Sequence, residues 1–464
     1  MTMKKILLLT TYFPPSINPG VYRNIKFIKY LAKHNYSFIV LTLLQKRSKP
    51  DPGMRDESLL NELPSVTKIK RVIPFPRETI ENIFLKLKLT RCLRMIYLPD
   101  EDVFNLGKLI KAGNQICEKE KIDLIYVSMP GFATLGMAGI ILKRKFNIPL
   151  VLDFRDPWID HIFSEYETIL HYWVNRYLER KVIQESDGII VVTKTHKAHL
   201  EQKYKDIDKK IIVINNGYDE EDFKDFSERS EEKIFNIIYT GAFYGYKPEK
   251  EKIYKKLLQI FYNLGKYYPY KVRKEEINTH TPYYFFRALQ LLFRHNPSLR
   301  DKIRITIAGG KYIIFEKLAE EMGIEENVSF QGQLAHKQVI QLLGKADLLL
   351  YVLLSKTENN RSGYCVPGKT YEYIRSGKPI LALVPEGDAK EILEKAGTAY
   401  FADPTSPEEI ADLLERLYQL HCQGGIPVQP NWEFIQQFER SRQAKKLAEF
   451  LDQILEQAKN PSNQ

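Results

Sequence analysis

The sequence predicts an α/β protein built from two doubly wound domains that face one another across a cleft. Three observations support this fold class. The chain has 464 residues, which is too long for one hydrophobic core. Apolar, strand-like runs alternate with helical patterns through two successive series. Glycine-rich or charged loops follow several of these runs, and ligands of open α/β sheets bind beyond the carboxyl ends of the strands.

The first series fills the N-terminal half and the second series fills the C-terminal half. The continuous apolar character of the runs is typical of strands buried on both faces of a parallel sheet. The expected strands cover residues 6–11, 38–43, 122–128, 149–152, 188–193 and 210–215, then 235–240, 303–308, 328–330, 347–354 and 380–384. We therefore expect a first domain over residues 1–218 and a second over 219–431, with a helix at 432–458 that packs back on the first.

The composition indicates which classes of partner the protein could bind and which compartment suits it. Hydrophobic residues are 44% and charged residues 27%, as in ordinary folded proteins. The formal net charge of +11 favours an anionic partner, which could be a nucleotide sugar, an acidic lipid surface or nucleic acid. The four cysteines, Cys92, Cys117, Cys365 and Cys422, are widely spaced, so neither a disulfide framework nor a zinc site is expected. A reducing cytoplasm fits this usage.

Targeting and membrane segments are not expected. The N-terminus, MTMKKILLLTTYFPP, begins like a signal peptide, but its apolar part is short and no small-residue cleavage site follows. It is better interpreted as a first strand. No apolar run reaches 18 residues, so a transmembrane helix is not predicted.

The stretch 364–383, YCVPGKTYEYIRSGKPILAL, predicts a loop, a short helix and a buried strand. Pro367 suits a helix start and Gly377 suits a helix end. Lys369 and Glu372 are three residues apart and therefore share a face. Lys369 and the helix N-terminus would hold a phosphate, and Glu372 would accept hydrogen bonds from a ribose diol. The alternative is an ordinary surface pair of lysine and glutamate.

Loops after other strands carry further candidates. In the first domain, Gly20 would let a phosphate approach the backbone near a helix start, and Arg23 lies in the first turn. In the second, the loop GAFYGYKPE offers Gly241 and the cation Lys247.

The segment PLVLDFRDPW runs from an apolar strand into Asp153, Arg155 and Asp156. These groups are candidates for polar chemistry at a strand end, and the alternative is a structural pair of arginine and aspartate.

Residues 83–98 mix apolar and basic residues. As a helix this segment would place Leu85 and Ile96 on one apolar face. It fits either a helix on a lipid surface or a core-facing helix with a solvated basic side, and the second is favoured. Residues 250–281 interleave basic and aromatic residues, but no motif of a nucleic-acid-binding protein is present.

Several motifs together resemble those of family 4 glycosyltransferases, which have the glycosyltransferase B fold of two Rossmann-like domains. The matching stretches are YFPPSINPG, PLVLDFRDPW, VVTKTHKAHL, VINNGYDEEDF, YTGAFYGYKPE, ITIAGG, VSFQGQLAHKQVIQLLGKADLLLYV, PGKTYEYIRSGKPILAL and WEFIQQFERSRQAKKLAEFL. They cover nearly the whole chain apart from residues 45–115 and 250–290.

The resemblance implies an enzyme of the hexosyltransferase type that moves a sugar from a nucleotide-diphosphate sugar to a glycan or lipid-linked acceptor in polysaccharide or glycoconjugate synthesis. The second domain would bind the donor and the first the acceptor. The family usually retains the anomeric configuration and needs no metal or other cofactor. The protein would be cytoplasmic and would touch the anionic inner face of the plasma membrane as a peripheral protein. Nucleic acid is not an expected partner.

The resemblance also assigns roles to single residues. Glu372 matches the glutamate that holds the donor ribose, and Lys369 and Lys247 fall where cations neutralise the donor pyrophosphate. Arg361 would add to this charge, and Gly20 matches a glycine loop over the phosphates.

Gly332 and Gln333 match a turn that contacts the base of the donor. Arg23 and Gly241 complete the expected donor-binding residues. On the acceptor side, Asp156 would position or deprotonate a hydroxyl, and Arg155 would bind an anionic acceptor or orient Asp156.

Two departures from the family pattern leave other functions open. Tyr364 stands where the family carries the first glutamate of a pair, and Ser128 stands at a strand end where many relatives carry histidine. A catalytically degenerate subunit that binds a nucleotide or a glycan is the first alternative. A nucleotide-sugar epimerase on the same fold is the second, and a nucleic-acid-binding protein is the weakest.

Overall fold

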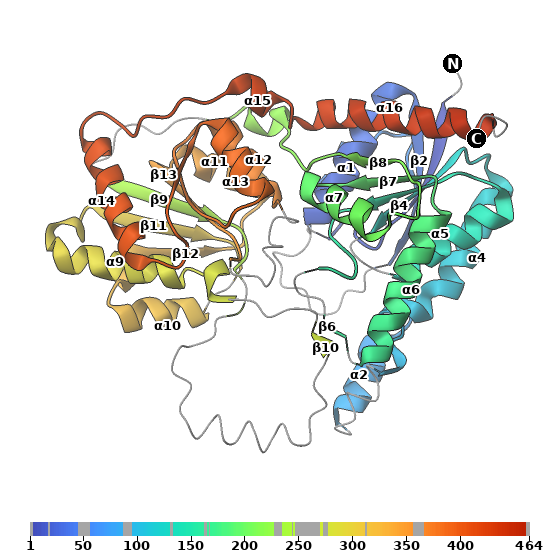
Figure 1. The fold of residues 1–464 in the computed structure, drawn as a ribbon, viewed down its shortest axis with the longest axis horizontal. Coiled ribbons are helices and arrows are strands. Elements are labelled where there is room, and N and C mark those ends of the chain that lie inside the picture. Colours follow the sequence, from blue (N-terminus) through green and yellow to red (C-terminus); the bar gives the residue numbers. More distant parts are fainter. Residues whose placement is uncertain are drawn as a thin grey trace. The chain divides into compact units, whose positions relative to one another are not determined.

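The structure is a computed structural model of the chain (Figure 1). It describes residues 3–16, 19–44, 56–86, 95–129, 133–161, 165–166, 168–226, 234–243, 245, 270–271, 277–310, 313–355 and 366–460. Three residues singled out from the sequence, Lys247, Arg361 and Tyr364, lie outside the described residues.

The chain divides into two compact units. Unit 1 comprises Met1–Asn215, Leu257–Val272 and Arg440–Gln464, and unit 2 comprises Asn216–Lys256 and Arg273–Glu439.

Unit 1 is built on a seven-stranded sheet in which all neighbouring strands are parallel. The order is β3-β2-β1-β4-β5-β7-β8. Such a sheet is doubly wound, and its order reverses between β1 and β4. The strands are β1 (Lys4–Leu9), β2 (Tyr36–Leu43), β3 (Lys68–Val72), β4 (Leu124–Met129), β5 (Leu150–Phe154), β7 (Gly188–Val191) and β8 (Ile211–Val213).

Helices cover both faces of this sheet. The side chains of β1 show the reason, because they point alternately into two cores. Ile6 and Leu8 pack into a core with α1 and α16, whereas Leu7 and Leu9 pack into a core with α4, α5 and α6. Successive strand residues point to opposite faces, so a strand buried on both faces needs an unbroken apolar run. The helices are α1 (Pro19–Leu31), α2 (Arg77–Lys86), α4 (Leu106–Lys119), α5 (Ala133–Phe146), α6 (Ile169–Glu185), α7 (Lys194–Lys203) and α16 (Arg440–Lys459).

Short elements complete unit 1. They are the 3₁₀ turns η1 (Ala32–His34), η3 (Ser58–Glu62) and η4 (Val103–Asn105), and an antiparallel pair of two-residue strands, β6 (Glu165–Tyr166) with β10 (Tyr270–Lys271).

Unit 2 repeats the architecture with a six-stranded parallel sheet in the order β12-β11-β9-β13-β14-β15, which reverses between β9 and β13. The strands are β9 (Phe235–Thr240), β11 (Ile303–Ala308), β12 (Val328–Gly332), β13 (Leu348–Val352), β14 (Ile380–Leu383) and β15 (Ala399–Phe401).

The two faces of the second sheet are again separate cores. Ile237 and Tyr239 pack with α9, α10 and α14, and Ile238 packs with α11, α12 and α13. The helices are α9 (Tyr283–His295), α10 (Ile313–Met322), α11 (His336–Gly344), α12 (Gly368–Ser376), α13 (Asp388–Ala396), α14 (Pro407–Cys422) and α15 (Trp432–Gln436), and the 3₁₀ turns are η5 (Glu220–Phe223), η6 (Ile277–His280), η7 (Pro297–Leu299) and η8 (Glu325–Asn327). The structure thus confirms the predicted α/β class with two doubly wound, Rossmann-like domains.

The C-terminal helix differs from the prediction. The sequence predicts one helix over 432–458, but α15 ends at Gln436 and α16 begins at Arg440. Glu439 forms a parallel bridge with Tyr218, which takes its backbone out of the helical path. Helix α15 contacts α12 and α13, and it belongs to unit 2.

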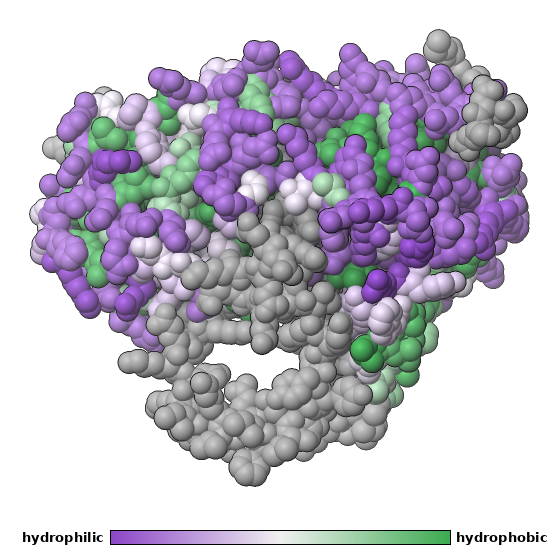
Figure 2. All heavy atoms as spheres, in the orientation of Figure 1, coloured by the Kyte–Doolittle hydropathy of each residue, from purple (hydrophilic) through white to green (hydrophobic). Residues whose placement is uncertain are grey.

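The amphipathic segment at 83–98 also differs from the favoured interpretation. Ile83 and Leu85 in α2 are 52% and 64% exposed, and Met95 and Ile96 are about half exposed at 50% and 53%. A core-facing helix is therefore the wrong interpretation for these described positions. Figure 2 shows hydrophobic side chains gathered around α2.

Candidate functional site

Helix α12 begins and ends where its sequence predicts. Pro367 is the N-cap with an extended backbone, and Gly377 ends the helix in the left-handed conformation at φ +69°. The helix starts near the carboxyl ends of β9 and β13, where the order of the second sheet reverses. In doubly wound sheets this position binds ligands.

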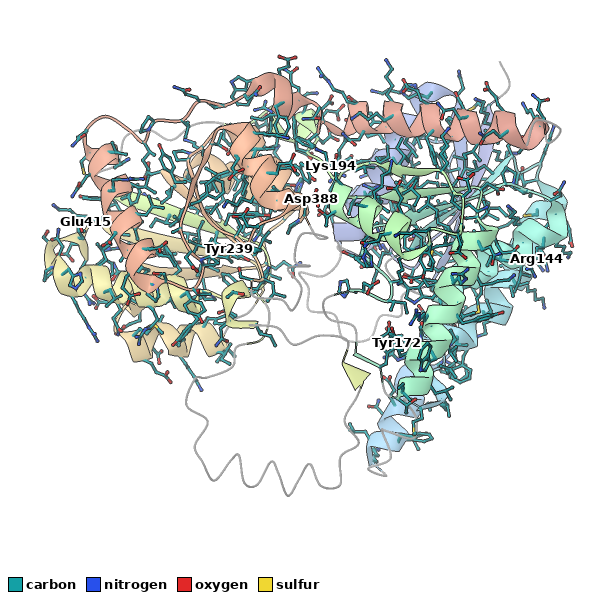
Figure 3. The ribbon with its side chains drawn as sticks, in the orientation of Figure 1. Arg144, Tyr172, Lys194, Tyr239, Asp388 and Glu415 are labelled. Carbon is teal, nitrogen blue, oxygen red and sulfur yellow. The ribbon has the colours of Figure 1, made fainter. Side chains whose placement is uncertain are left out.

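The side chain of Lys369 is enclosed at this position by aromatic rings. Its Nζ lies 3.9 Å from the ring centroid of Tyr239 and 5.4 Å from that of Tyr351. Burial lowers the pKa of Lys369 to about 7. Within the part of the chain that the structure describes, no carboxylate forms an ion pair with Lys369. Figure 3 draws the surrounding side chains and labels Tyr239.

Gly241, which directly follows β9, lies next to this lysine. Its φ is +121°, and a Cβ atom added to it would lie 3.4 Å from Lys369 Nζ. A side chain here would be strained by the backbone angle. Gly241 and Lys369, both named from the sequence, are therefore neighbours in unit 2.

Buried hydroxyl groups fix α12 to the sheet. Tyr373 Oη accepts a hydrogen bond from the backbone N–H of Thr240 at 2.8 Å, and Tyr351 Oη bonds Thr370 Oγ1 at 2.6 Å. Because partners of buried polar groups are costly to lose, these bonds hold α12 against the ends of β9 and β13.

Glu372 is paired with a histidine that the sequence analysis did not connect to it. Its Oε1 lies 2.8 Å from Nε2 of His336, the first residue of α11, and His336 Nδ1 lies 3.7 Å from Asp222. The side chains of Glu372 and His336 are 15% and 25% exposed, so both reach solvent. The pairing depends on contact between α11 and α12, which no local pattern shows.

His280, a buried histidine near Lys369, was also not predicted from the sequence. His280 in η6 lies near enough to Lys369 for the ammonium charge to act on it. Burial, aided by that charge, lowers the pKa of His280 to about 3, so the imidazole is neutral at physiological pH. Thr279 Oγ1 accepts a hydrogen bond from Ser355 N at 2.7 Å, which ties η6 to the chain that follows β13.

Gly332 and Gln333 lie at the end of β12, the edge strand of the second sheet. Gly332 has φ +65°, and its carbonyl accepts a hydrogen bond from Gly309 N at 2.8 Å. Gln333 is exposed. These residues share the carboxyl edge of the sheet with Gly241.

In unit 1, the structural arginine–aspartate pair is Arg23 with Asp153. The Arg23 Nε and Nη2 atoms each lie 2.9 Å from a carboxylate oxygen of Asp153, and Arg23 also donates to the carbonyls of Ile214 and Asn215. Both side chains are almost fully buried, at 2% and 0% exposed. Arg23 thus joins α1, β5 and the end of the strand series, and its guanidinium is already occupied.

Arg155 lies on Gly20. A Cβ atom added to Gly20 would fall 1.2 Å from Arg155 Nη1, so the absence of a side chain is what admits the guanidinium. The Arg155 guanidinium carbon is 5.4 Å from the ring centroid of Tyr12. Asp156 is partly buried beside it. Ser128 at the end of β4 is fully buried, at 0% exposed.

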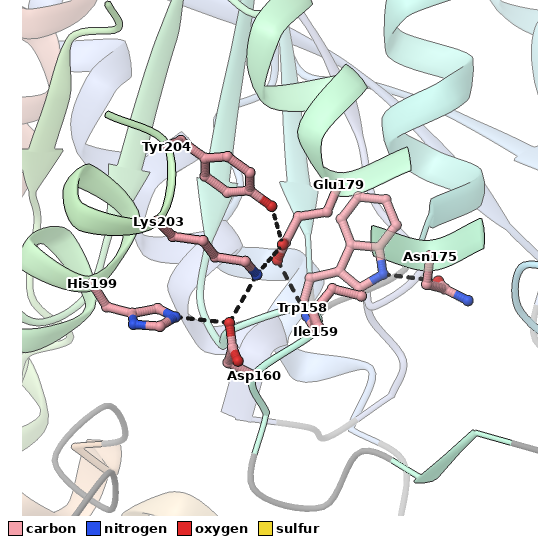
Figure 4. Close-up of polar contacts among 8 residues, drawn as sticks. All are labelled: Trp158, Ile159, Asp160, Asn175, Glu179, His199, Lys203 and Tyr204. Carbon is pink, nitrogen blue, oxygen red and sulfur yellow. Dashed lines mark hydrogen bonds and ion pairs between the residues drawn. The ribbon is translucent and has the colours of Figure 1, made fainter. Parts of the chain in front are cut away.

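A buried polar cluster anchors the loop after Asp156 (Figure 4). Glu179 of α6 accepts hydrogen bonds from Ile159 N at 3.2 Å and from Lys203 and Tyr204 of the α7 end. Asp160 lies 2.7 Å from His199 Nε2 and 2.8 Å from Lys203 Nζ.

Burial alone would raise the pKa of Asp160, but hydrogen bonds and charge from His199 and Lys203 outweigh it, and the pKa is lowered. The carboxylate stays ionised, and the cluster holds the loop that carries Arg155 and Asp156 onto α6 and α7.

Two features that the described residues lack concern metal binding and membrane spanning. No group of three or more histidine, cysteine, aspartate or glutamate side chains is placed to hold a metal ion there. None of the helices in the described ranges is long and apolar enough to cross a membrane.

Two protein-family models match this chain, one mainly in unit 1 and one in unit 2. The model of Glycosyltransferase Family 4 matches residues 23–222, and the model of Glycosyl transferases group 1 matches residues 282–422. Together they span more than half of the chain. The chain belongs to glycosyltransferase family 4. This confirms the resemblance drawn from the sequence motifs, and the protein is a glycosyltransferase.

Solved structures share the fold of this glycosyltransferase over nearly its whole length. Sucrose-phosphate synthase from Thermosynechococcus elongatus matches with a TM-score of 0.63 at 13% identity, covering 98% of this chain and 99% of the other. HepE from Anabaena in complex with UDP-glucose matches with a TM-score of 0.59 at 15% identity, covering 97% and 99%.

A putative UDP-N-acetylglucosamine 2-epimerase from Listeria monocytogenes matches with a TM-score of 0.53 at 13% identity, covering 98% of both chains. Fold likeness alone therefore does not separate transferase from epimerase, and the family models do. A comparison with curated protein sequences returned no match.

Proposed function

We propose that this glycosyltransferase moves a sugar from a nucleotide-diphosphate sugar to a glycan or lipid-linked acceptor in polysaccharide or glycoconjugate synthesis. The observation that carries the proposal is Lys369, a largely enclosed cation at the start of α12 that has no carboxylate partner among the described residues. A largely enclosed ammonium without a counter-ion is costly, and its lowered pKa expresses that cost. A bound anion would remove it.

The diphosphate of the donor is the anion that fits. As the glycosidic bond to the donor breaks, negative charge develops on the diphosphate leaving group, and a preorganised cation stabilises it. Lys369 lies against the rings of Tyr239 and Tyr351 rather than against an acid among the described residues, so its charge is available for that purpose. The N-terminus of α12 and the backbone at Gly241 add donors and a favourable dipole.

The proposed contacts for the ribose and the base of the donor lie at the same edge of the sheet. Glu372 faces solvent three residues along the helix, where a ribose diol would replace or share its contact with His336. Gly332 and Gln333 lie along the carboxyl edge for the base. A uracil nucleotide is the first to test, since HepE was solved with UDP-glucose.

On the acceptor side, Asp156 is the proposed group that positions or deprotonates the attacking hydroxyl. Retention of the anomeric configuration rests on the family resemblance. Metal independence rests on Lys369, which supplies at the diphosphate the positive charge that a metal ion would otherwise bring.

Lys369→Ala tests the donor site. We expect the Kd for UDP to rise by about tenfold to a hundredfold, as for loss of a charge-assisted contact, while the Kd for uridine changes by less than about twofold. Lys337→Ala is the control, because Lys337 is exposed and pairs with Asp225. Equal losses for UDP and uridine would contradict a diphosphate role.

A catalytically degenerate binding subunit is the second candidate. It is favoured by Ser128, whose fully buried hydroxyl stands where relatives carry an imidazole, and by Tyr364. The two candidates differ in one observable. A transferase releases nucleoside diphosphate from a bound donor, by transfer or slow hydrolysis, whereas a degenerate subunit binds the donor and returns it intact.

We also propose that the enzyme acts in the cytoplasm and touches an anionic membrane through unit 1. Large apolar side chains are exposed in α2 and in the first half of α6, including Trp173 at 53% and Tyr177 at 65%. The side chain of Asn175 donates to the carbonyl of Pro99 at 2.9 Å, which ties α6 to the chain just after Ile96. Exposed apolar groups beside basic residues are typical of an interfacial surface.

A further inference from the structure

His336 lies between two carboxylates of unit 2. Its Nε2 atom is 2.8 Å from Glu372 Oε1, and its Nδ1 atom is 3.7 Å from Asp222 Oδ2. All three side chains are 15–25% exposed. They come from α11, α12 and η5, which are far apart in sequence. The row is therefore a product of tertiary packing, and it is still open to a ligand.

The stability of α11 does not explain a histidine at this position. His336 is the first residue of the helix, after the N-cap Ala335. The N-terminal end of a helix carries partial positive charge and disfavours a cation. A neutral imidazole would present an unprotonated nitrogen to one of the two carboxylates, whereas the imidazolium can donate from both nitrogens. The two carboxylates thus favour a charged donor where the helix itself does not.

The two carboxylates are held near one another by a separate contact. Arg375 Nε donates to Glu220 Oε2 at 2.8 Å, which ties α12 to η5. Arg375 is one turn along α12 from Glu372, and Glu220 shares η5 with Asp222. Loss of the imidazole would therefore leave two like charges close together with no donor between them. Repulsion would then turn the Glu372 carboxylate away from its present position.

We propose that His336 is a positioning residue for the donor ribose, because it fixes one carboxylate oxygen of Glu372 and leaves the other acceptor positions to the ribose diol. The proposal rests on the proposed function. An ionised carboxylate has about four lone-pair sites on its two oxygens, so the bond from His336 does not exhaust it. A glutamate side chain has several rotamers, and a bond that already selects one reduces the entropy lost on binding.

Asp222 supports the imidazole from its other side. The 3.7 Å separation is too long for a hydrogen bond, so Asp222 acts through its charge. It favours a proton on Nδ1 and leaves the Nε2 proton directed at Glu372. Its contribution should be smaller than that of His336.

Calorimetry with matched nucleotides tests this role. UDP, GDP, ADP and CDP are titrated into the full chain, and the one that binds most tightly is compared with its 2′-deoxy form. Wild type should bind the deoxy form roughly tenfold to a hundredfold more weakly, as for loss of a hydrogen bond to a charged group. In His336→Ala this ratio should fall below about threefold, because only the ribo form loses affinity.

Three further variants separate positioning from a structural role. His336→Gln keeps an N–H donor for Glu372 and should restore most of the ratio. Asp222→Asn removes only a charge and should lower the ratio by about twofold to threefold. Lys337→Ala is the control, because Lys337 is the next residue of α11 and pairs with Asp225, and it should leave the ratio unchanged.

An unchanged ratio in His336→Ala, whether both affinities hold or both fall together, would overturn the proposal. A wild type without preference for the ribo form would do the same, and so would a ratio in His336→Gln as low as in His336→Ala. Failure of the proposed donor site would look different. In that case none of the four nucleoside diphosphates binds, or Glu372→Ala keeps the wild-type ratio.

Discussion

Binding of a nucleoside diphosphate should draw a proton onto Lys369. In the unliganded protein the pKa of this lysine is about 7, because burial disfavours its charge. A diphosphate beside the amine favours the charged form and would restore a pKa near the ordinary value of roughly 10.4. Above pH 7 the unliganded amine is mostly neutral, whereas the complex needs it protonated. Affinity should therefore fall as pH rises.

The magnitude follows from these two pKa values. At pH 8 a group with a pKa of about 7 is protonated in roughly one molecule in ten, so binding takes up about 0.9 proton. The Kd should rise by about tenfold per pH unit between roughly pH 7.5 and 9.5. The terminal phosphate of the nucleotide, with a pKa near 6, is already ionised in this range and adds little slope. His280 is neutral throughout, because its pKa of about 3 lies far below.

Calorimetry of UDP binding at pH 8, in buffers that differ in ionisation enthalpy, counts these protons. Wild type should take up close to one. Lys369→Arg should bind with little uptake, since arginine is protonated already. Lys337→Met, which alters an exposed lysine, should leave the count unchanged. Uptake near zero in wild type, or equal uptake in Lys369→Met, would refute the placement of the diphosphate at Lys369.

Three further predictions concern the donor ribose, the acceptor and the membrane. Glu372→Ala should raise the donor KM by about tenfold to a hundredfold with folding preserved, as expected for a charged hydrogen bond; unchanged kinetics would remove Glu372 from the site. Asp156→Asn should lower kcat by about a hundredfold or more while the donor Kd holds, and a fall in donor affinity instead would place Asp156 on the donor side or in the scaffold. The double variant Trp173→Ser with Tyr177→Ser should reduce co-sedimentation with vesicles rich in phosphatidylglycerol at least fivefold, whereas Trp432→Ser in unit 2, similarly exposed, should not; equal binding of all three proteins would contradict the membrane proposal.

Much of the fold is predictable because short stretches of sequence determine its strands and helices. Strands buried on both faces need continuous apolar runs, and β9 and β11 lie at the residues expected for them. Helix α12 follows from its own start and stop signals at Pro367 and Gly377. The break between α15 and α16 was not predictable, because it depends on the pairing of Glu439 with Tyr218, more than two hundred residues away in sequence.

The site is predictable in its residue types and less so in its partners. The spacing of Lys369 and Glu372 indicated a shared face, but it could not show that Lys369 is enclosed by Tyr239 or that Glu372 meets His336. Likewise the run DFRDPW indicated an arginine–aspartate pair, but it could not show that Asp153 pairs with Arg23. Such pairings are set by tertiary packing and carry no local signal.

The central claim is that unit 2 holds a nucleoside diphosphate at Lys369. The most direct measurement is calorimetric binding of UDP, GDP, ADP, CDP and their sugars, first without metal and then with magnesium, on wild type and Lys369→Ala. The account predicts that one nucleoside diphosphate binds wild type in the micromolar range without metal and binds Lys369→Ala at least about tenfold more weakly. If no nucleotide binds, or if the one that binds is indifferent to Lys369→Ala, the donor site is not where the structure has led us to place it.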